Sequence, residues 1–84
     1  VCLNEACRLS PTSFKAFYNR GKCRLRLRYH DEAVADLIRA VKLKPKHIAA
    51  HEYLADAYEA VGEQELAEGQ RAIAEALRRE KGKG

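Results

Sequence analysis

Two histidines offer the most specific candidate chemistry in the sequence. His47 and His51 are four residues apart, a spacing that places two imidazoles on one face of a helix, as many zinc sites require. Glu52 follows His51, but no histidine stands three residues after this glutamate, so the helical zinc-protease motif is absent. We therefore expect both histidines to be packing or surface residues, and we predict no metal ion and no cofactor.

The other reactive side chains form no recognisable catalytic set. The chain has neither a glycine-rich phosphate loop nor a Gly-x-Ser-x-Gly motif. Asp56, Glu59 and Glu63 lie on or near one polar helical face, which is typical of solvated carboxylates. The three cysteines lack the CxxC spacing of a zinc or redox site, so we expect free thiols. We predict no catalytic residues and no enzyme activity.

The composition indicates one small globular domain. Of the 84 residues, 46% are hydrophobic and 33% are charged, which is typical of a folded protein. No apolar run approaches the roughly 18 residues of a membrane span, and no signal-peptide pattern is visible. We therefore expect an intracellular, cytoplasmic protein with no membrane partner. Because the sequence starts without Met and within a helical pattern, we also expect it to be a piece of a longer protein.

The elements that carry these residues repeat along the chain. Pro11 and Pro45 define a 34-residue interval, and many similar residues share it, among them Ala33 with Ala67 and Leu43 with Leu77. Apolar residues recur every three or four positions between the breakers at the prolines and at a glycine, which predicts helices. We predict five helices, over about residues 1–10, 13–28, 31–44, 47–61 and 64–80, and no strands.

These residues resemble the tetratricopeptide repeat, a two-helix unit whose length equals this interval. Its signature has an aromatic residue, Leu-Gly and Tyr in the first helix, then Ala, a large apolar residue, Ala and Pro. The matching positions hold Phe17, Arg20-Gly21, Arg24, Ala33, Leu37, Ala40 and Pro45 in one unit, and His51, Leu54-Ala55, Tyr58, Ala67, Arg71, Ala74 and Arg79 in the next. Two departures in the second unit, Arg71 and Arg79, lead us to expect a polar capping helix at the end of the array.

The resemblance implies an all-α, right-handed superhelical solenoid of antiparallel helix pairs, about two and a half repeats long. Residues 1–10 would be the second helix of a truncated preceding repeat. Residues 11–45 would form the first full unit, and residues 46–80 the second unit with its capping helix. We expect residues 81–84 to form a flexible basic tail.

In this family the first helices of successive units line a concave groove that holds a partner peptide. The equivalent positions here are Lys15, Tyr18, Asn19, Lys22, Arg26, Glu52, Tyr53 and Asp56. The resemblance therefore implies a scaffold or adaptor module that binds a protein or peptide of acidic or mixed charge. Lys22 and Asp56 are equivalent positions on adjacent helices, so they could instead pair with each other.

The charge distribution leaves other interpretations open. Residues 15–28 carry a charge of +6 and residues 47–69 a charge of −6, although the whole chain carries only +4. The basic helix could bind RNA, but phosphate would be repelled by the acidic block beside it, which argues against nucleic acid. Acidic groups of neighbouring helices, or of a ligand, could offset the crowded arginines.

Two further functions are alternatives to docking in the groove. One is a purely structural role, in which the segment packs within a larger repeat protein or self-associates, with Arg20 and Arg24 against an acidic neighbour. The other is a carboxylate clamp for chaperone tails, because Asn19 matches the central asparagine of that clamp. Ala49 and Tyr53 stand where the clamp needs Lys and Arg, which argues against this function.

Overall fold

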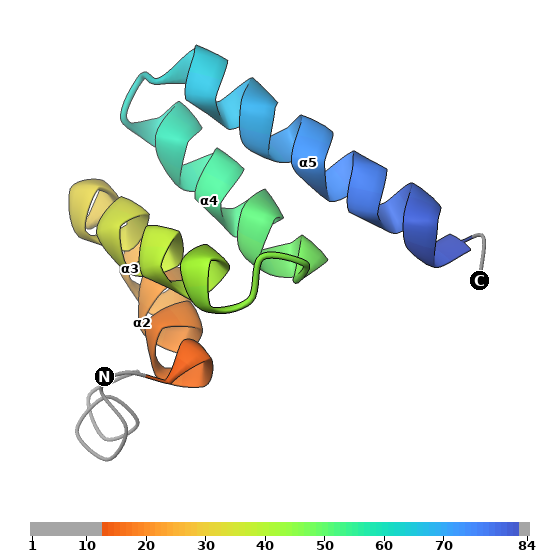
Figure 1. Cartoon of the computed structure of the whole chain (residues 1–84). Coiled ribbons are helices and arrows are strands. Elements are labelled where there is room, and N and C mark those ends of the chain that lie inside the picture. The colour runs from red at the N-terminus through yellow and green to blue at the C-terminus, as the bar shows by residue number, and fades with distance from the viewer. Residues whose placement is uncertain (1–12, 83–84) are drawn as a thin grey trace.

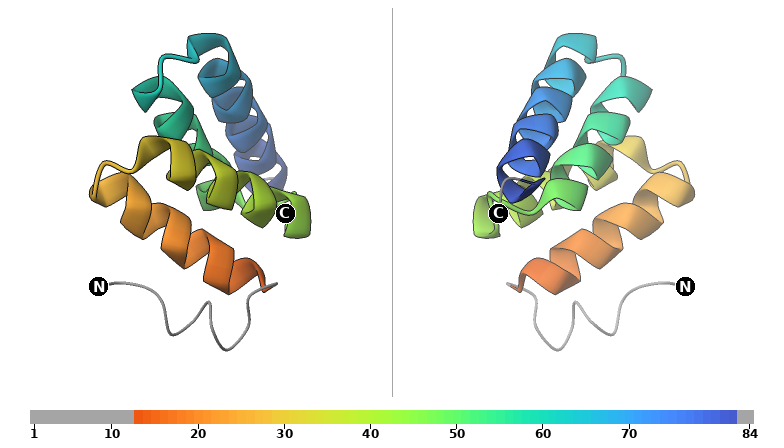
Figure 2. Two further views of the ribbon diagram at one scale, coloured as in Figure 1. Left: turned by 90° about the vertical axis from the view of Figure 1, so that its left-hand side faces the viewer. Right: turned by 90° about the vertical axis from the view of Figure 1, so that its right-hand side faces the viewer.

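The computed structural model describes residues 13–82, and the ordered elements within them are all α-helices. They are α2 (Phe14–Arg26), α3 (His30–Leu43), α4 (Ile48–Ala60) and α5 (Gln64–Gly82) (Figure 1). Helix α2 pairs with α3, α4 pairs with α5, and α3 joins the two pairs by packing on α4. Figure 2 shows the same stack from its sides, with α2 and α5 at opposite edges. The all-α fold class is confirmed; the helix expected over residues 1–10 lies outside the described residues.

The interval that separates Pro11 from Pro45 is also the interval between helix ends. Helices α2 and α4 begin at Phe14 and Ile48 and end at Arg26 and Ala60, so the same interval separates their starts and their ends. It also separates the first residues of α3 and α5, His30 and Gln64. The repeat is therefore structural, and the two helix pairs are equivalent units.

Equivalent side chains begin the first helix of each pair. The hydroxyl of Ser13 accepts a hydrogen bond from the backbone N–H of Ala16, at 3.1 Å. Nδ1 of His47 accepts the corresponding bond from the N–H of Ala50, also at 3.1 Å. Each cap satisfies a donor that the first turn of a helix leaves without a partner.

A residue in the left-handed region closes each helix pair. Arg28 has φ 71° and Gly62 has φ 88°. The N–H of Arg28 donates to the carbonyl of Leu25 at 3.1 Å, and the N–H of Tyr29 donates to the carbonyl of Arg24 at 2.8 Å. The same two bonds close the second turn, and this pattern is a Schellman motif. Because the motif ends the helix, α2 stops two residues before its predicted end.

The core of the described region lies where the helix pairs meet. Leu37 of α3 and Leu54 of α4 are its largest fully buried side chains. Ala33 and Ala57 complete the central cluster. Gly21 of α2 approaches Leu37 so closely that a Cβ there would lie 2.7 Å from the Leu37 Cγ atom. Close helix contact therefore depends on small residues at these positions.

Helix α5 differs from α3 on the face that would receive a following helix. On α3 this face carries Val34, Ile38 and Val41, which are half-buried against the core. The equivalent residues of α5, one repeat later, are Glu68, Ala72 and Glu75, and all three are exposed. This face of α5 is therefore more polar and more exposed than the equivalent face of α3.

The last helix is longer than the sequence pattern predicts. It extends to Gly82, so Lys81, which we expected in a flexible tail, lies in its last turn together with Arg79. Basic side chains at a helix C-terminus interact favourably with the helix dipole, which explains the extension. The remainder of the predicted tail lies outside the described residues. None of the helices within residues 13–82 has the length and hydropathy needed to cross a membrane.

Candidate functional site

Aromatic rings from α2, from α4 and from the residue that caps α4 lie together, and a lysine lies over two of them. We call Phe14, Tyr18, Lys22, His47 and Tyr53 the aromatic cluster. The ring centroids of Phe14 and Tyr18 are 5.2 Å apart, and those of Tyr18 and Tyr53 are 5.8 Å apart. The ammonium of Lys22 lies 4.9 Å from the Tyr18 centroid and 5.5 Å from the Tyr53 centroid. These distances permit cation–π attraction to both rings.

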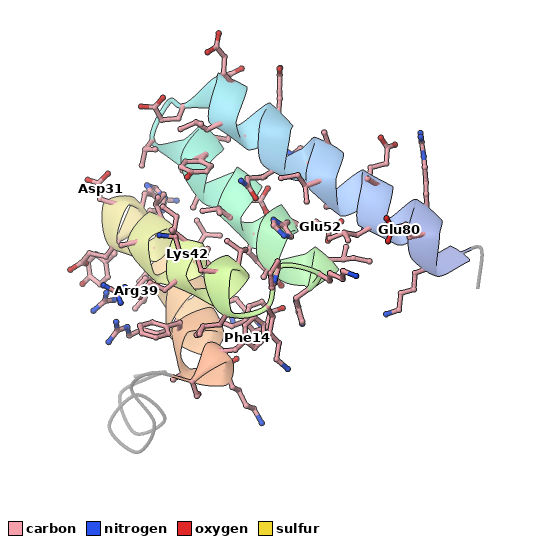
Figure 3. All side chains as sticks on the ribbon, in the orientation of Figure 1. Phe14, Asp31, Arg39, Lys42, Glu52 and Glu80 are labelled. Atoms are coloured by element: carbon pink, nitrogen blue, oxygen red, sulfur yellow. The ribbon has the colours of Figure 1, made fainter. Side chains whose placement is uncertain are left out.

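Helical spacing and the cap of α4 bring the cluster together. Phe14, Tyr18 and Lys22 follow one another at intervals of four, so they share one face of α2. The His47 ring lies 4.7 Å from the Phe14 ring and 5.0 Å from the Tyr18 ring. The hydrogen bond by which His47 caps α4 fixes the ring in this position. All members are half-buried, and Figure 3 labels Phe14 at the start of α2. The cluster is a preformed surface whose residues come from two units.

Burial and nearby charges shift the pKa values of two rings in the cluster. Burial, and then the nearby Tyr53 and Glu52, raise the pKa of Tyr18, so its phenol stays protonated. Burial lowers the pKa of His47, and the positive charges of Lys44 and Lys81 lower it further. At neutral pH the rings of Tyr18 and His47 are therefore uncharged.

Ion pairs between α4 and α5 border the cluster. Arg71 of α5 donates to Asp56 at 3.2 Å and to Glu59 at 2.9 Å, and Arg78 pairs with Glu52. The hydrogen bond from Arg71 lowers the pKa of Glu59, and the bonds to both carboxylates raise the pKa of Arg71. Figure 3 labels Glu52 on α4.

An open cavity of about 640 Å³ lies among these charges. Its lining comes from α4 and α5 and includes the carboxylates of Glu52, Asp56, Glu68 and Glu75. The guanidinium groups that pair with the first two also line it. A partner that entered this cavity would meet charges of both signs.

The predicted groove residues separate into three groups. Tyr18, Lys22 and Tyr53 meet in the aromatic cluster. Glu52 and Asp56 line the cavity beside it. The remaining three, Lys15, Asn19 and Arg26, lie on α2 outside the cluster, and Lys15 and Arg26 are exposed.

The pairing of Lys22 with Asp56, which the sequence left open, is not what the structure contains. Lys22 stands over the two tyrosine rings, while Asp56 accepts from Arg71.

The basic helix α2 is partly neutralised within the domain. Arg20 donates to both carboxylate oxygens of Asp36, at 2.9 and 2.8 Å, and Arg24 donates to the same carboxylate at 3.1 Å. Asp36 of α3 is only 4% exposed. A carboxylate of a neighbouring helix therefore offsets the repulsion between these arginines, which was one of the two possibilities the sequence left open.

The two histidines have different structural roles. His51 is 5% exposed, and its ring nitrogens contact the carbonyl oxygen of Pro45 at 2.7 Å and the side-chain oxygen of Gln70 at 2.6 Å. His47 caps α4 and contacts the cluster rings. Across residues 13–82, no group of three or more His, Cys, Asp or Glu side chains is placed to hold a metal ion. Cys23 is disulfide-bonded, so the expectation of free thiols is wrong for this residue.

Sequence reasoning missed three residues of the site. Phe14 and His47 belong to the aromatic cluster, and Asp36 holds the two arginines. Phe14 could have been found from the sequence, because it lies four residues before Tyr18 and therefore on the same face of the helix. No pattern indicated that a histidine would cap a helix where serine caps its counterpart.

The chain forms a helical-repeat domain. Its helix pairs recur at the interval that separates Pro11 from Pro45, and the first helices of both pairs share one surface. The family model for the bacterial transcriptional activator domain matches residues 1–82, and the chain belongs to this family. The helical-repeat part of the resemblance is thus confirmed, while the sequence analysis did not anticipate this family.

Solved structures share the fold. The chain is similar to the crystal structure of MamA, with a TM-score of 0.84 and 25% sequence identity, over 94% of this chain and 46% of that chain. A second MamA structure, described as MamA MSR-1 C2, is matched with a TM-score of 0.80 and 25% identity, over 89% of this chain and 43% of that one. The chain spans less than half the length of both. Among curated proteins, none matches the sequence.

Proposed function

We propose that this domain is a non-catalytic docking module of the tetratricopeptide type, which binds a protein or peptide partner and serves a transcriptional activator. The family name supports the role in transcription. The equal interval between the ends of α2 and α4 supports the repeat type. The docking surface would be the aromatic cluster together with the charged cavity beside it.

The observation that carries this proposal is the position of the Lys22 ammonium over the rings of both Tyr18 and Tyr53. Each tyrosine offers a large apolar ring and a polar hydroxyl, the combination enriched at protein interfaces. Because the rings pack on each other and on the lysine, their conformations are restricted before a partner arrives. Binding would therefore lose little side-chain entropy.

The charged cavity suits a partner of mixed charge. Its α4 wall carries the carboxylates of Glu52 and Asp56, and its α5 wall carries both carboxylates and guanidinium groups. Exposed ion pairs contribute little to stability, so their exchange for pairs with a partner is inexpensive in free energy. These charges would set the register and orientation of a bound segment, while the rings would supply apolar contact.

The chemistry of the site supports binding rather than catalysis. The imidazole of His47 uses Nδ1 to accept the N–H of Ala50, so this nitrogen is not available as a base. The guanidinium of Arg71 holds the carboxylates of Asp56 and Glu59, and its hydrogen bond lowers the pKa of Glu59. The arginines of α2 that share Asp36 are less suited to phosphate binding than the sequence suggested.

Single substitutions in the cluster test the proposal. The intact protein and the variants Tyr18→Ala, Lys22→Ala and Tyr53→Ala are used to capture partners, and the captured protein is then titrated. We expect roughly tenfold weaker binding for each tyrosine variant, as for other interface tyrosines, and about threefold for the lysine variant. Lys42→Ala, on the exposed side of α3 (Figure 3), is the matched control and should bind normally.

Helicity measured by circular dichroism verifies that each variant is folded. Equal capture by the intact protein and all three cluster variants would refute the assignment of the surface.

A further inference from the structure

The outer face of α5 carries an apolar stripe that no other described helix covers. Among the helices of residues 13–82, α5 contacts only α4 (Figure 1). Leu66 and Ile73 are 49% and 41% exposed, although they are large hydrophobic residues. Gly69 and Ala76 alternate with them at spacings of three and four, so all four lie along one side of the helix. The space around Gly69 is open.

We propose that this stripe binds a second copy of the same chain, with the two α5 helices antiparallel. The stripe reads large, small, large, small along the helix. When a second copy runs in the opposite direction, Leu66 faces Ala76 and Ile73 faces Gly69, and the reciprocal contacts follow from the two-fold symmetry. In a parallel pair, each large residue would instead lie level with its own equivalent.

The charges beside the stripe favour the same arrangement. Glu65 and Arg79 are separated by two heptads, so they lie on the same edge of the stripe at its two ends. In the antiparallel pair, Glu65 of each copy approaches Arg79 of the other. A parallel pair would place like charges at the same level. Arg79 is free to make this contact because its bond to Glu75 is long, at 3.7 Å, and both side chains are largely exposed.

This contact is independent of the docking surface proposed above. The aromatic cluster lies on α2 and α4, whereas the stripe lies on α5 away from the charged cavity. One face would therefore join two copies while the other held a partner.

Sedimentation equilibrium of the full chain over a range of concentrations tests this inference. We expect a concentration-dependent dimer that Ile73→Arg abolishes, because a guanidinium would replace the central apolar contact. Leu43→Arg is the matched control, since Leu43 is also an exposed apolar residue, at 48%, but lies on α3. This control should leave the dimer unchanged.

A charge exchange tests the orientation. Glu65→Arg alone should raise the dissociation constant about fivefold, because both symmetric pairs become repulsive. Adding Arg79→Glu should restore the dimer. Both positions are exposed, so these variants decide the question even if Ile73→Arg lowers the helicity.

Other results would overturn the inference. A monomer at all concentrations would mean that the stripe serves a different protein or none. A dimer that survives Ile73→Arg, or is lost in Leu43→Arg, would place the contact elsewhere. A double charge variant that fails to recover would exclude the antiparallel arrangement.

Discussion

Gly21 is the position where a single methyl group should matter most. A Cβ at this residue would lie 2.7 Å from Cγ and 2.9 Å from Cδ2 of Leu37. Leu37 is completely buried in the central cluster, so it has no free space into which it can withdraw. Gly21→Ala should therefore force α2 and α3 apart.

Two opposing contributions determine the size of the effect. Alanine is favoured over glycine in a helix interior by about 1 kcal/mol. Overpacking of a close-packed core costs about 1–3 kcal/mol, and contacts this short belong in the upper half of that range. The free energy of unfolding should consequently fall by about 1–2 kcal/mol. For a domain of this size, the melting temperature should fall by roughly 4–8 °C for each kcal/mol.

Urea and thermal denaturation followed by circular dichroism measure this effect. Gly69→Ala is the control, because a Cβ added to that helical glycine would meet nothing within 4 Å outside its own stretch of helix. At low protein concentration, the control should gain about 0.5–1 kcal/mol. If Gly21→Ala is as stable as this control, the steric argument is wrong. Combining it with Leu37→Ala should cost less than the sum of the single effects.

Three further predictions concern the turns, the cap and the buried carboxylate. Arg28→Gly should stabilise the domain by about 0.5–1 kcal/mol and Gly62→Ala should destabilise it by about 1 kcal/mol, because both residues have a left-handed backbone conformation. Denaturant midpoints in the reverse order would contradict this prediction. The pKa of His47 is lower in the folded domain than in the unfolded chain, so the unfolded chain binds a proton first as the pH falls. The contribution of neutral His47 to the free energy of unfolding should be fully present above about pH 6.5 and should decrease as the pH falls towards the folded-state pKa. His47→Asn keeps a capping oxygen and should flatten this decline in urea titrations at several pH values, whereas an unchanged slope would exclude His47 as its source. Asp36→Ala should cost about 2 kcal/mol, since two arginines lose their shared carboxylate, and denaturation of the variant would show no change if the pairs contribute nothing.

The helices could be predicted from the sequence because their limits are chemically explicit. Proline, glycine and the 34-residue interval indicate most of the helix limits, although α2 ends at Arg26 rather than at residue 28 and α5 continues to Gly82. The meeting of Tyr18, Lys22 and Tyr53 was also predictable, since their register places them on the first helices of adjacent units. Local rules and repetition are sufficient for these features.

Other features depend on tertiary packing and have no local signature. The sequence offers many acidic residues that could pair with Arg20 and Arg24, and only the packing of α2 on α3 selects Asp36. The cap by His47 depends on the side-chain rotamer of a residue that seldom has this role. The stripe on α5 becomes visible only when its exposure is known.

The buried carboxylate of Asp36 also bears on how two similar helix pairs avoid exchanging partners. The residues of α4 equivalent to Arg20 and Arg24 are Leu54 and Tyr58, which cannot neutralise a carboxylate. If α3 folded onto α4 in the place of α5, Asp36 would be buried without a counter-ion, at a cost of several kcal/mol. The buried charge of Asp36 therefore makes α3 pack specifically on α2. Two similar helix pairs can in this way fold with only one pairing of their helices.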